Sequence, residues 1–146
     1  MLDKSTICAV STAPGVGGIA VIRVSGPEAL PVALRLFRYG GETPVAESVK
    51  PRYAYYGEVI AGDELIDEVV LTYFRAPHSF TGEDTVEISC HGSVYIRRRL
   101  LESLVGEGCQ MAQPGEFTRR AYLNGRMDLS RAEAVAVIIA SESKAQ

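Results

Sequence analysis

The sequence predicts an α+β domain in which helices flank a mixed β-sheet. Five segments rich in Ile, Val, Ala and Tyr are typical of strands, and helical patterns lie among them without the regular spacing of a parallel βαβ fold. The chain has 146 residues, of which 47% are hydrophobic and 23% charged. This size and composition can bury one hydrophobic core without disulfides or metals.

The N-terminal part is predicted to form two strands and a helix. Residues 5–11 and 19–24 have the strand composition, and a loop containing Pro and three Gly separates them. Residues 29–37 carry apolar side chains at helical spacing. Ser25 and Glu28 precede them at the spacing of a capping box, which predicts the start of a helix.

The central part is predicted to form a hairpin, a further strand and a second helix. Residues 52–60 and 65–74 are rich in Tyr and Val and surround a short turn. Residues 85–91 alternate between apolar and polar side chains, as a half-buried strand does. Ser93 is a suitable N-cap for a helix that ends at Gly106.

The C-terminal part predicts a short strand over residues 109–112 and a helix over 114–124. A second capping box, at 130–133, introduces residues 132–140, which are apolar almost all round a helix and therefore need neighbours on several sides. We expect the chain to be an N-terminal fragment cut inside a helix of a following helical domain. The alternative is a natural, frayed C-terminus.

Charge and composition exclude several classes of protein. The formal charge is −3, from 15 Lys and Arg against 18 Asp and Glu, whereas domains that hold nucleic acid mainly by charge carry a basic excess. The longest apolar run, residues 134–140, is far shorter than the roughly 20 residues of a membrane span. The start of the chain lacks a secretion signal, and three widely spaced cysteines favour a reducing cytoplasm.

The strand at 85–91 presents a polar strip. Thr85, Glu87, Ser89 and His91 share one face, and Cys90 lies on the opposite face with the apolar residues of the core. Glu87 and His91 are about 13 Å apart along this strand, so they cannot share one proton or metal ion. The strip either lines a long, flat ligand or is simply the hydrated face of an antiparallel sheet.

Arg23 is the only charged residue of the predicted strand at 19–24. It shares a face with Ile19 and Val21, and a guanidinium in such surroundings favours a carboxylate partner. Glu87 on a neighbouring strand is a candidate. The alternative is an arginine that extends to solvent at the margin of the sheet.

Other motifs point more weakly to chemistry. The glycine loop at 14–18 lacks the Gly-Lys pair of a phosphate loop and precedes a strand instead of a helix, so a hairpin turn is its commoner explanation. Cys90 and His91 are adjacent in a strand and face opposite sides, which argues against a catalytic dyad. The two histidines, His78 and His91, and the cysteines lack zinc spacing. Arg97, Arg98 and Arg99 spread around a helix and are expected to be solvated or locally paired, with phosphate binding a minor option.

Two further segments suit a binding site. Residues 76–84 form a loop with Pro, Gly, aromatic and acidic residues directly before the polar strip. Arg126 follows a helix stop signal, where an exposed cation can reach an anionic group.

Three long motifs resemble the MnmE (TrmE) family of bacterial tRNA-modification GTPases, specifically its N-terminal domain. They are residues 12–26, 76–92 and 114–134, in the family's order, and the resemblance covers nearly the whole chain. One departure is visible, because Ser93 stands where the family often has a second Gly after His91-Gly92. Serine at this position suits a helix cap.

The resemblance implies a fold and a set of activities. It implies a folate-binding domain over residues 1–118, related in shape to aminomethyltransferases, that homodimerises and binds 5-formyltetrahydrofolate, a tetrahydrofolate derivative. Residues 119–146 would begin the central helical domain, and the GTPase domain, with its GTP, Mg²⁺ and K⁺, would be absent here. The complete cytoplasmic protein would act with the flavin-dependent MnmG to add an aminomethyl-type group to the wobble uridine of tRNA.

By motif position, the resemblance places the folate contacts on Arg23, Glu87 and Arg126, with no catalytic residue and no metal ligand. Glu87 would accept hydrogen bonds from the pterin, and the two arginines would meet its carbonyl or glutamyl tail. Two alternatives stay open: a free-standing folate-dependent one-carbon transferase, and a scaffold that only pairs subunits. The transferase lacks an activated nucleophile or a close acid and base pair in this sequence.

Overall fold

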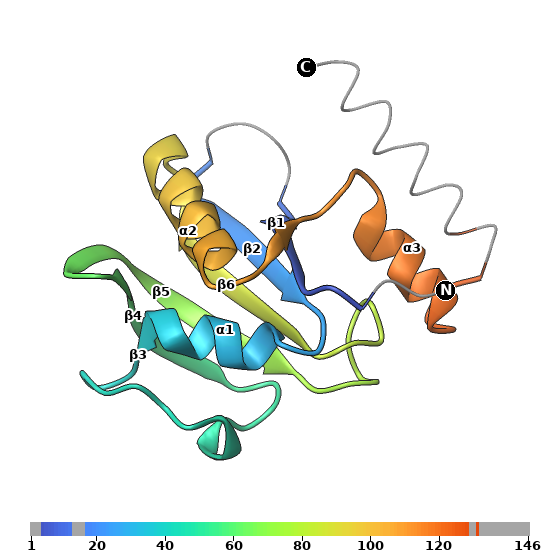
Figure 1. Cartoon of the computed structure of the whole chain (residues 1–146), viewed down its shortest axis with the longest axis horizontal. Coiled ribbons are helices and arrows are strands. Elements are labelled where there is room, and N and C mark those ends of the chain that lie inside the picture. The colour runs from blue at the N-terminus through green and yellow to red at the C-terminus, as the bar shows by residue number, and fades with distance from the viewer. Residues whose placement is uncertain (1–3, 13–16, 129–130, 132–146) are drawn as a thin grey trace.

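A single seven-stranded mixed sheet organises the molecule. The computed structural model describes residues 4–12, 17–128 and 131. The strand order is β3-β4-β5-β6-β2-β1-β7, and every neighbouring pair is antiparallel except β1 and β7 (Figure 1). The strands are β1 (Ile7–Val10), β2 (Ile19–Ser25), β3 (Phe37–Arg38), β4 (Ala54–Ala61), β5 (Glu64–Phe74), β6 (Thr85–His91) and β7 (Gln110–Met111). The prediction of an α+β fold with a mixed sheet is confirmed.

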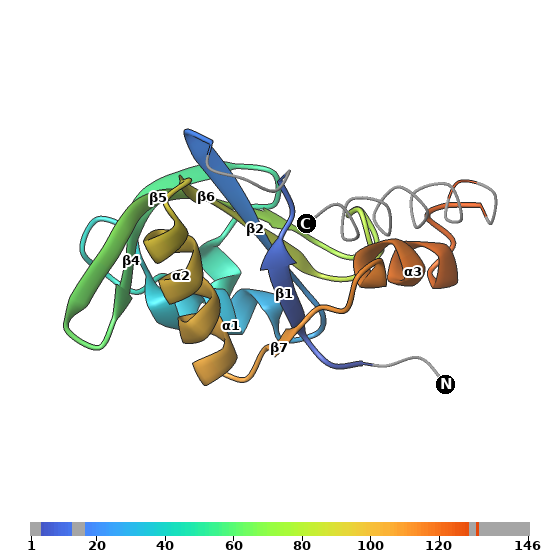
Figure 2. The same ribbon diagram turned by 90° about the horizontal axis from the view of Figure 1, so that it is seen from above.

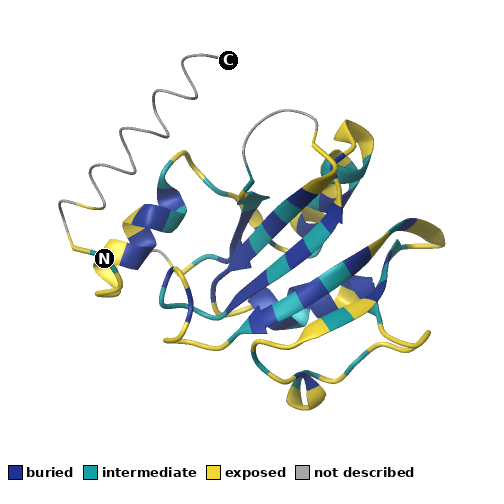
Figure 3. Ribbon diagram, turned by 180° about the vertical axis from the view of Figure 1, so that it is seen from behind, coloured by how far each residue is buried: buried dark blue, intermediate teal, exposed yellow. Residues whose placement is uncertain are grey.

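Two helices cover one face of the sheet. They are α1 (Ala29–Leu36) and α2 (Val94–Gly106), and they lie side by side on the same side of the strands (Figures 1 and 2). On the other face, seen from behind in Figure 3, no helix of the described residues lies in front of the central strands. A third helix, α3 (Glu116–Leu123), lies beyond the end of the sheet near the loop that joins β5 to β6. Within the described residues no helix is long and apolar enough to span a membrane.

The hydrophobic core lies between the sheet and α1 and α2. Alternate residues of the central strands point into it, and all are at most 4% exposed: Ala20, Ile22, Val24, Val86, Ile88 and Cys90. Leu100 and Leu104 of α2, both fully buried, meet them from the helix side. Cys90 is therefore a core residue, as its place in the alternation predicts. The remaining side chains of these strands, including Arg23 and Glu87, point to the uncovered face.

The hairpin and the capped helix α2 are confirmed. Strands β4 and β5 pair along their length with a bulge between Val59 and Ile60. The Ser93 hydroxyl accepts a hydrogen bond from the Ile96 N–H at 3.0 Å and so caps α2. Arg98 and Arg99 pair locally with Glu102, as expected for arginines on a helix surface.

The predicted capping box at the start of α1 is wrong. Glu28 is the N-cap residue, and its side chain makes no capping hydrogen bond; its N–H donates to the Thr6 hydroxyl at 3.0 Å. Ser25 is the last residue of β2, fully buried, and its hydroxyl bonds to Thr81 and Glu83 instead. The spacing of a capping box describes only local sequence, whereas tertiary packing has given this serine partners from another loop.

Several sequence predictions lie partly or wholly outside the described residues. They concern the glycine loop, whose residues 13–16 are not described, the capping box at 130–133 and the apolar segment 132–140. The proposed domain boundary after residue 118 falls within α3 and stays a prediction.

Candidate ligand-binding site

Arg23 and Glu87 form an ion pair on the uncovered face of the sheet. They are directly opposite one another in the antiparallel pairing of β2 and β6, and Arg23 Nε donates to Glu87 Oε2 at 3.1 Å. Their side chains are 18% and 28% exposed, so the pair is shielded but reachable. The structure thus brings together the charged pair that the sequence suggested. Within the described residues, Arg23 Nη atoms and Glu87 Oε1 have no hydrogen-bond partner.

Two aromatic rings enclose the Arg23 guanidinium. Its Cζ lies 4.6 Å from the centre of the Phe80 ring and 5.2 Å from that of Phe117. Both distances suit cation–π contacts. Phe80 comes from the 76–84 loop and is 41% exposed, whereas Phe117 comes from α3 and is half-buried. The sequence indicated the 76–84 loop, which contains Phe80, as part of a binding site. It did not predict the contact of either ring with Arg23, because this contact depends on two segments that pack beyond the end of the sheet.

Arg126, which follows α3, contacts the same 76–84 loop. Its Nε donates to the Ser79 carbonyl oxygen at 3.1 Å, next to Phe80 in the chain. Arg126 is itself exposed, so its guanidinium is accessible to a ligand. Among the described residues no hydrogen bond or ion pair joins Arg126 to Arg23 or Glu87. The three predicted residues therefore gather around one loop, with two of them in direct contact.

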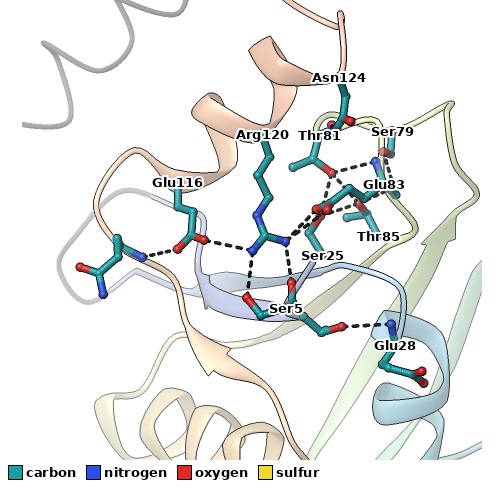
Figure 4. A network of polar contacts seen from close by, with 12 residues as sticks. Ser5, Ser25, Glu28, Ser79, Thr81, Glu83, Thr85, Glu116, Arg120 and Asn124 are labelled. Carbon is teal, nitrogen blue, oxygen red and sulfur yellow. Dashed lines mark hydrogen bonds and ion pairs between the residues drawn. The ribbon is translucent and has the colours of Figure 1, made fainter. Parts of the chain in front are cut away.

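A buried charged cluster connects α3, the 76–84 loop and the segment before β1 (Figure 4). We call it the Arg120 clamp and define it as Arg120, Glu83, Glu116 and Ser5. Arg120 is 3% exposed and contacts Glu83 at 3.1 Å and Glu116 at 3.0 Å. It also donates to the carbonyl oxygen and the hydroxyl of Ser5, at 2.6 and 3.1 Å. This cluster was not predicted from the sequence, where its one signal is the i, i+4 spacing of Glu116 and Arg120.

Hydroxyl groups extend the clamp to the ends of β2 and β6. The Ser25 hydroxyl donates to Glu83 Oε1 at 2.8 Å and lies 2.7 Å from the Thr81 hydroxyl. Thr85 donates to the Glu83 carbonyl oxygen at 3.0 Å and is only 1% exposed. Thr85 was expected to belong to a polar strip that either lines a ligand or is hydrated; at this position neither alternative holds, because the 76–84 loop covers the side chain. Ser89 and Glu87 are half-buried and His91 is exposed, so the strip begins after Thr85.

Cys90 and His91 do not form a dyad. His91 Nδ1 lies 2.8 Å from Asp67 Oδ1, while burial raises the pKa of the Cys90 thiol to about 11. The pKa of the Cys8 thiol is also raised, mainly by its hydrogen bond with Cys109 and in addition by burial. A protonated thiol is a poor nucleophile. No group of three or more His, Cys, Asp or Glu among the described residues is arranged to hold a metal ion.

The chemistry of this site is recognition by charge and hydrogen bonding. A carboxylate with unused lone pairs accepts hydrogen bonds from amino and ring N–H groups, and a nearby guanidinium donates to carbonyl or carboxylate oxygens. Aromatic side chains beside them suit a flat, polar ring. The arrangement therefore fits a planar heterocycle with an anionic substituent.

Comparison with known proteins agrees with the resemblance found in the sequence. Residues 6–126 match the family described as GTP-binding protein TrmE N-terminus. The chain is similar to the tRNA modification GTPase MnmE of Porphyromonas gingivalis, with 69% identity over 144 residues, 99% of this chain and 30% of the relative. The MnmE of Parabacteroides distasonis is 59% identical over 97% of this chain and 31% of that protein. The MnmE of Enterococcus faecalis is 46% identical over 97% and 30%.

The chain spans less than a third of the length of these relatives. The family match nevertheless extends from the start of β1 to Arg126 and so includes the whole of the site. The chain therefore belongs to the family of TrmE N-terminal domains, the N-terminal part of the tRNA-modification GTPases called MnmE.

Proposed function

We propose that this chain is the formyl-tetrahydrofolate-binding and homodimerisation module of a tRNA-modification GTPase. The observation that carries the proposal is the Arg23–Glu87 ion pair on the uncovered face, flanked by Phe80 and Phe117. Neither a nucleophile nor a metal centre is assigned to the module. Its part in the reaction is to hold the one-carbon carrier.

Each residue has a role that follows from its hydrogen-bonding groups. The amino-pyrimidine edge of a pterin donates two parallel hydrogen bonds, which a carboxylate such as Glu87 accepts. Arg23 donates to the pterin carbonyl from the same surface. Arg126 is exposed beside the Ser79 carbonyl oxygen and can meet the glutamyl tail of the folate.

The uncovered face of the sheet has apolar surface that a second subunit could cover. Ile19 is 69% exposed and Val21 half-buried on the same side of β2 as Arg23, which leaves apolar surface beside the charged pair. Covering this surface with another copy would shield both the apolar residues and the ligand. We propose that homodimerisation through this face completes the folate site.

The complete protein, of which this chain matches the first third, would supply the remaining functions. Relatives are named tRNA modification GTPases, so we assign GTP, Mg²⁺ and K⁺ to parts beyond this module. Within the whole protein, the bound one-carbon unit would be used with the flavin-dependent partner MnmG on the wobble uridine of tRNA in the cytoplasm.

Titration with 5-formyltetrahydrofolate tests the proposal. Replacing Glu87→Gln removes the charge with little change in shape, and we expect affinity to fall at least about tenfold, since hydrogen bonds to charged groups contribute about 1.5–3 kcal/mol. Calorimetry measures the affinity. Glu68→Gln is the matched control, because Glu68 lies on the uncovered face in β5 and bonds to Tyr56 instead of Arg23.

Sedimentation velocity accompanies the titration. We expect the wild-type chain and both variants to sediment as dimers. A wild-type dimer without affinity for folate would support the scaffold reading instead. Equal affinities of the wild-type chain and Glu87→Gln would refute the role given to Glu87.

A further inference from the structure

Two segments outside the sheet form the walls of the proposed site. Phe80 belongs to the 76–84 loop, and Phe117 belongs to α3. Arg126 follows α3 and bonds back to Ser79 of the loop. The site therefore exists only when the loop and α3 hold a fixed position relative to β2 and β6, which carry Arg23 and Glu87.

Apolar packing contributes little to that position. The described part of the core cluster contains no residue of α3. The buried residues of α3 are Glu116, Thr118, Arg120 and Ala121, of which only alanine is apolar. An apolar stripe usually fixes a helix on its domain. Here the buried face is polar, so specific polar contacts must set where α3 lies.

The Arg120 clamp supplies those contacts. Arg120 projects from α3 between Glu83 of the loop and Ser5 before β1, as Figure 4 shows. Glu83 in turn accepts a hydrogen bond from Ser25, two residues after Arg23 in β2. Buried charge-assisted hydrogen bonds are directional, so they fix orientation as well as distance. A short chain of contacts thus runs from α3 through the loop to the strand that bears Arg23.

We propose that Arg120 is a positioning residue of the ligand site. It contacts no ligand itself and holds Phe80, Phe117 and Arg126 in place around Arg23 and Glu87 through its bonds to Glu83 and Ser5. The inference rests on the proposed function, because the site it organises is the proposed folate site. Ligand affinity would then depend on a buried residue that makes no direct bond to Arg23 or Glu87.

The test compares variants of the clamp in the 146-residue chain. Arg120→Lys keeps the charge but loses the planar fork. The triple change Arg120→Met, Glu83→Gln and Glu116→Gln removes the charges of both described ion pairs together, so that neither carboxylate is left unpaired. Arg35→Met is the control, since it breaks the exposed Arg35–Glu107 pair, whose atoms are 2.9 Å apart. Affinity for 5-formyltetrahydrofolate is measured by calorimetry at a temperature where every variant is folded.

We expect at least a tenfold loss of affinity in the triple variant, a smaller loss in Arg120→Lys and none in Arg35→Met. Hydrogen exchange of the unliganded chain, followed by mass spectrometry, should speed up in residues 76–84 and 116–126 and stay unchanged in β4 and β5. Folded clamp variants with wild-type affinity would show a purely structural role and overturn the inference.

The two measurements separate this inference from the proposed function. If the wild-type chain fails to bind folate, the proposed function is wrong, whatever the clamp does. Hydrogen exchange then decides the inference by itself: faster exchange confined to the two segments would support positioning by Arg120, and unchanged exchange would overturn it.

Discussion

Helices α1 and α2 are attached to the sheet by apolar side chains, whereas α3 is attached by charges and hydroxyls. Leu100 of α2 is fully buried among the core residues of the central strands. Arg120 of α3 is almost as buried, yet its partners among the described residues include two carboxylates and Ser5. Each region therefore buries a helix face, but the interactions that hold the helix in place differ.

The difference shows which contacts mainly stabilise the fold and which mainly fix the relative orientation of its parts. Apolar packing depends on buried area and tolerates changes that keep the volume. A buried ion-pair cluster adds little net stability, because desolvation offsets most of the attraction, but its hydrogen bonds are directional and favour particular orientations of the groups that they join. Of the ligand-site residues from outside the sheet, Phe117 lies in α3, Phe80 in the loop bonded to α3 by Arg120, and Arg126 just after α3.

The largest expected effect comes from breaking the apolar region. Leu100→Ala leaves a cavity between α2 and the sheet and should lower the free energy of unfolding by about 2–5 kcal/mol. Urea denaturation measures it. Val94→Ala in the same helix is the control, because Val94 is 56% exposed and its change should stay within about 0.5 kcal/mol. Similar losses from both changes would contradict the placement of the core.

An intermediate effect is expected where β3 lies against β4. A side-chain carbon at Gly57 would meet the Arg38 carbonyl oxygen and lie 2.6 Å from the Phe37 ring. Gly57→Ala should therefore cost about 1–3 kcal/mol, as overpacked sites do. At Gly106, the last residue of α2, the same carbon meets open space, so Gly106→Ala should be neutral or slightly stabilising. Thermal unfolding of the two variants distinguishes these outcomes.

The smallest effect on stability is expected at the exposed Arg99–Glu64 ion pair, which can be compared with the buried ion pairs of Arg120. Glu64 accepts hydrogen bonds from Arg99 and Tyr95, and these bonds hold its pKa below the usual 4.5. A lowered carboxyl pKa stabilises the fold above pH 4.5, and the stabilisation is lost as the pH falls through the folded pKa. Glu64→Gln should lower Tm by a few degrees at most at pH 7.

Measuring Tm from pH 7 to pH 3 checks this prediction. The difference between wild type and Glu64→Gln should persist down to about pH 4.5 and shrink below it. A difference that stayed constant across the whole range would mean that the carboxylate charge contributes nothing.

Much of the fold could be predicted from the sequence because its signals are local. Alternation in residues 85–91 identified both the strand and the buried side of Cys90, and the Ser93 cap marked the start of α2. The capping box proposed at Ser25 failed because the same hydroxyl has partners 56 and 58 residues away along the chain. A local pattern carries no information about such partners.

The candidate site was predicted only in part. Arg23 stood out as a lone charge among apolar neighbours and Glu87 as the acid of the polar strip, so their pairing could be suggested. The 76–84 loop, which contains Phe80, was expected to suit a binding site. The contacts of Phe80 and Phe117 with Arg23 could not be predicted, since nothing in their local sequence distinguishes a ring that covers a guanidinium from one that packs in a core. Folate binding by Arg23, Glu87 and Arg126 stays a prediction.

By itself, the sequence determined most of the strands and helices and which side of the long strands is polar, because these follow from the periodicity of neighbouring residues. It did not predict the two-residue strand β3, and Phe37 belongs to this strand instead of to the preceding helix. The tertiary structure decided that β6 lies between β5 and β2, which places Glu87 beside an arginine 64 residues away. It also decided that Arg120 is buried, because the burial of a charge depends on which distant carboxylates and carbonyl groups surround it.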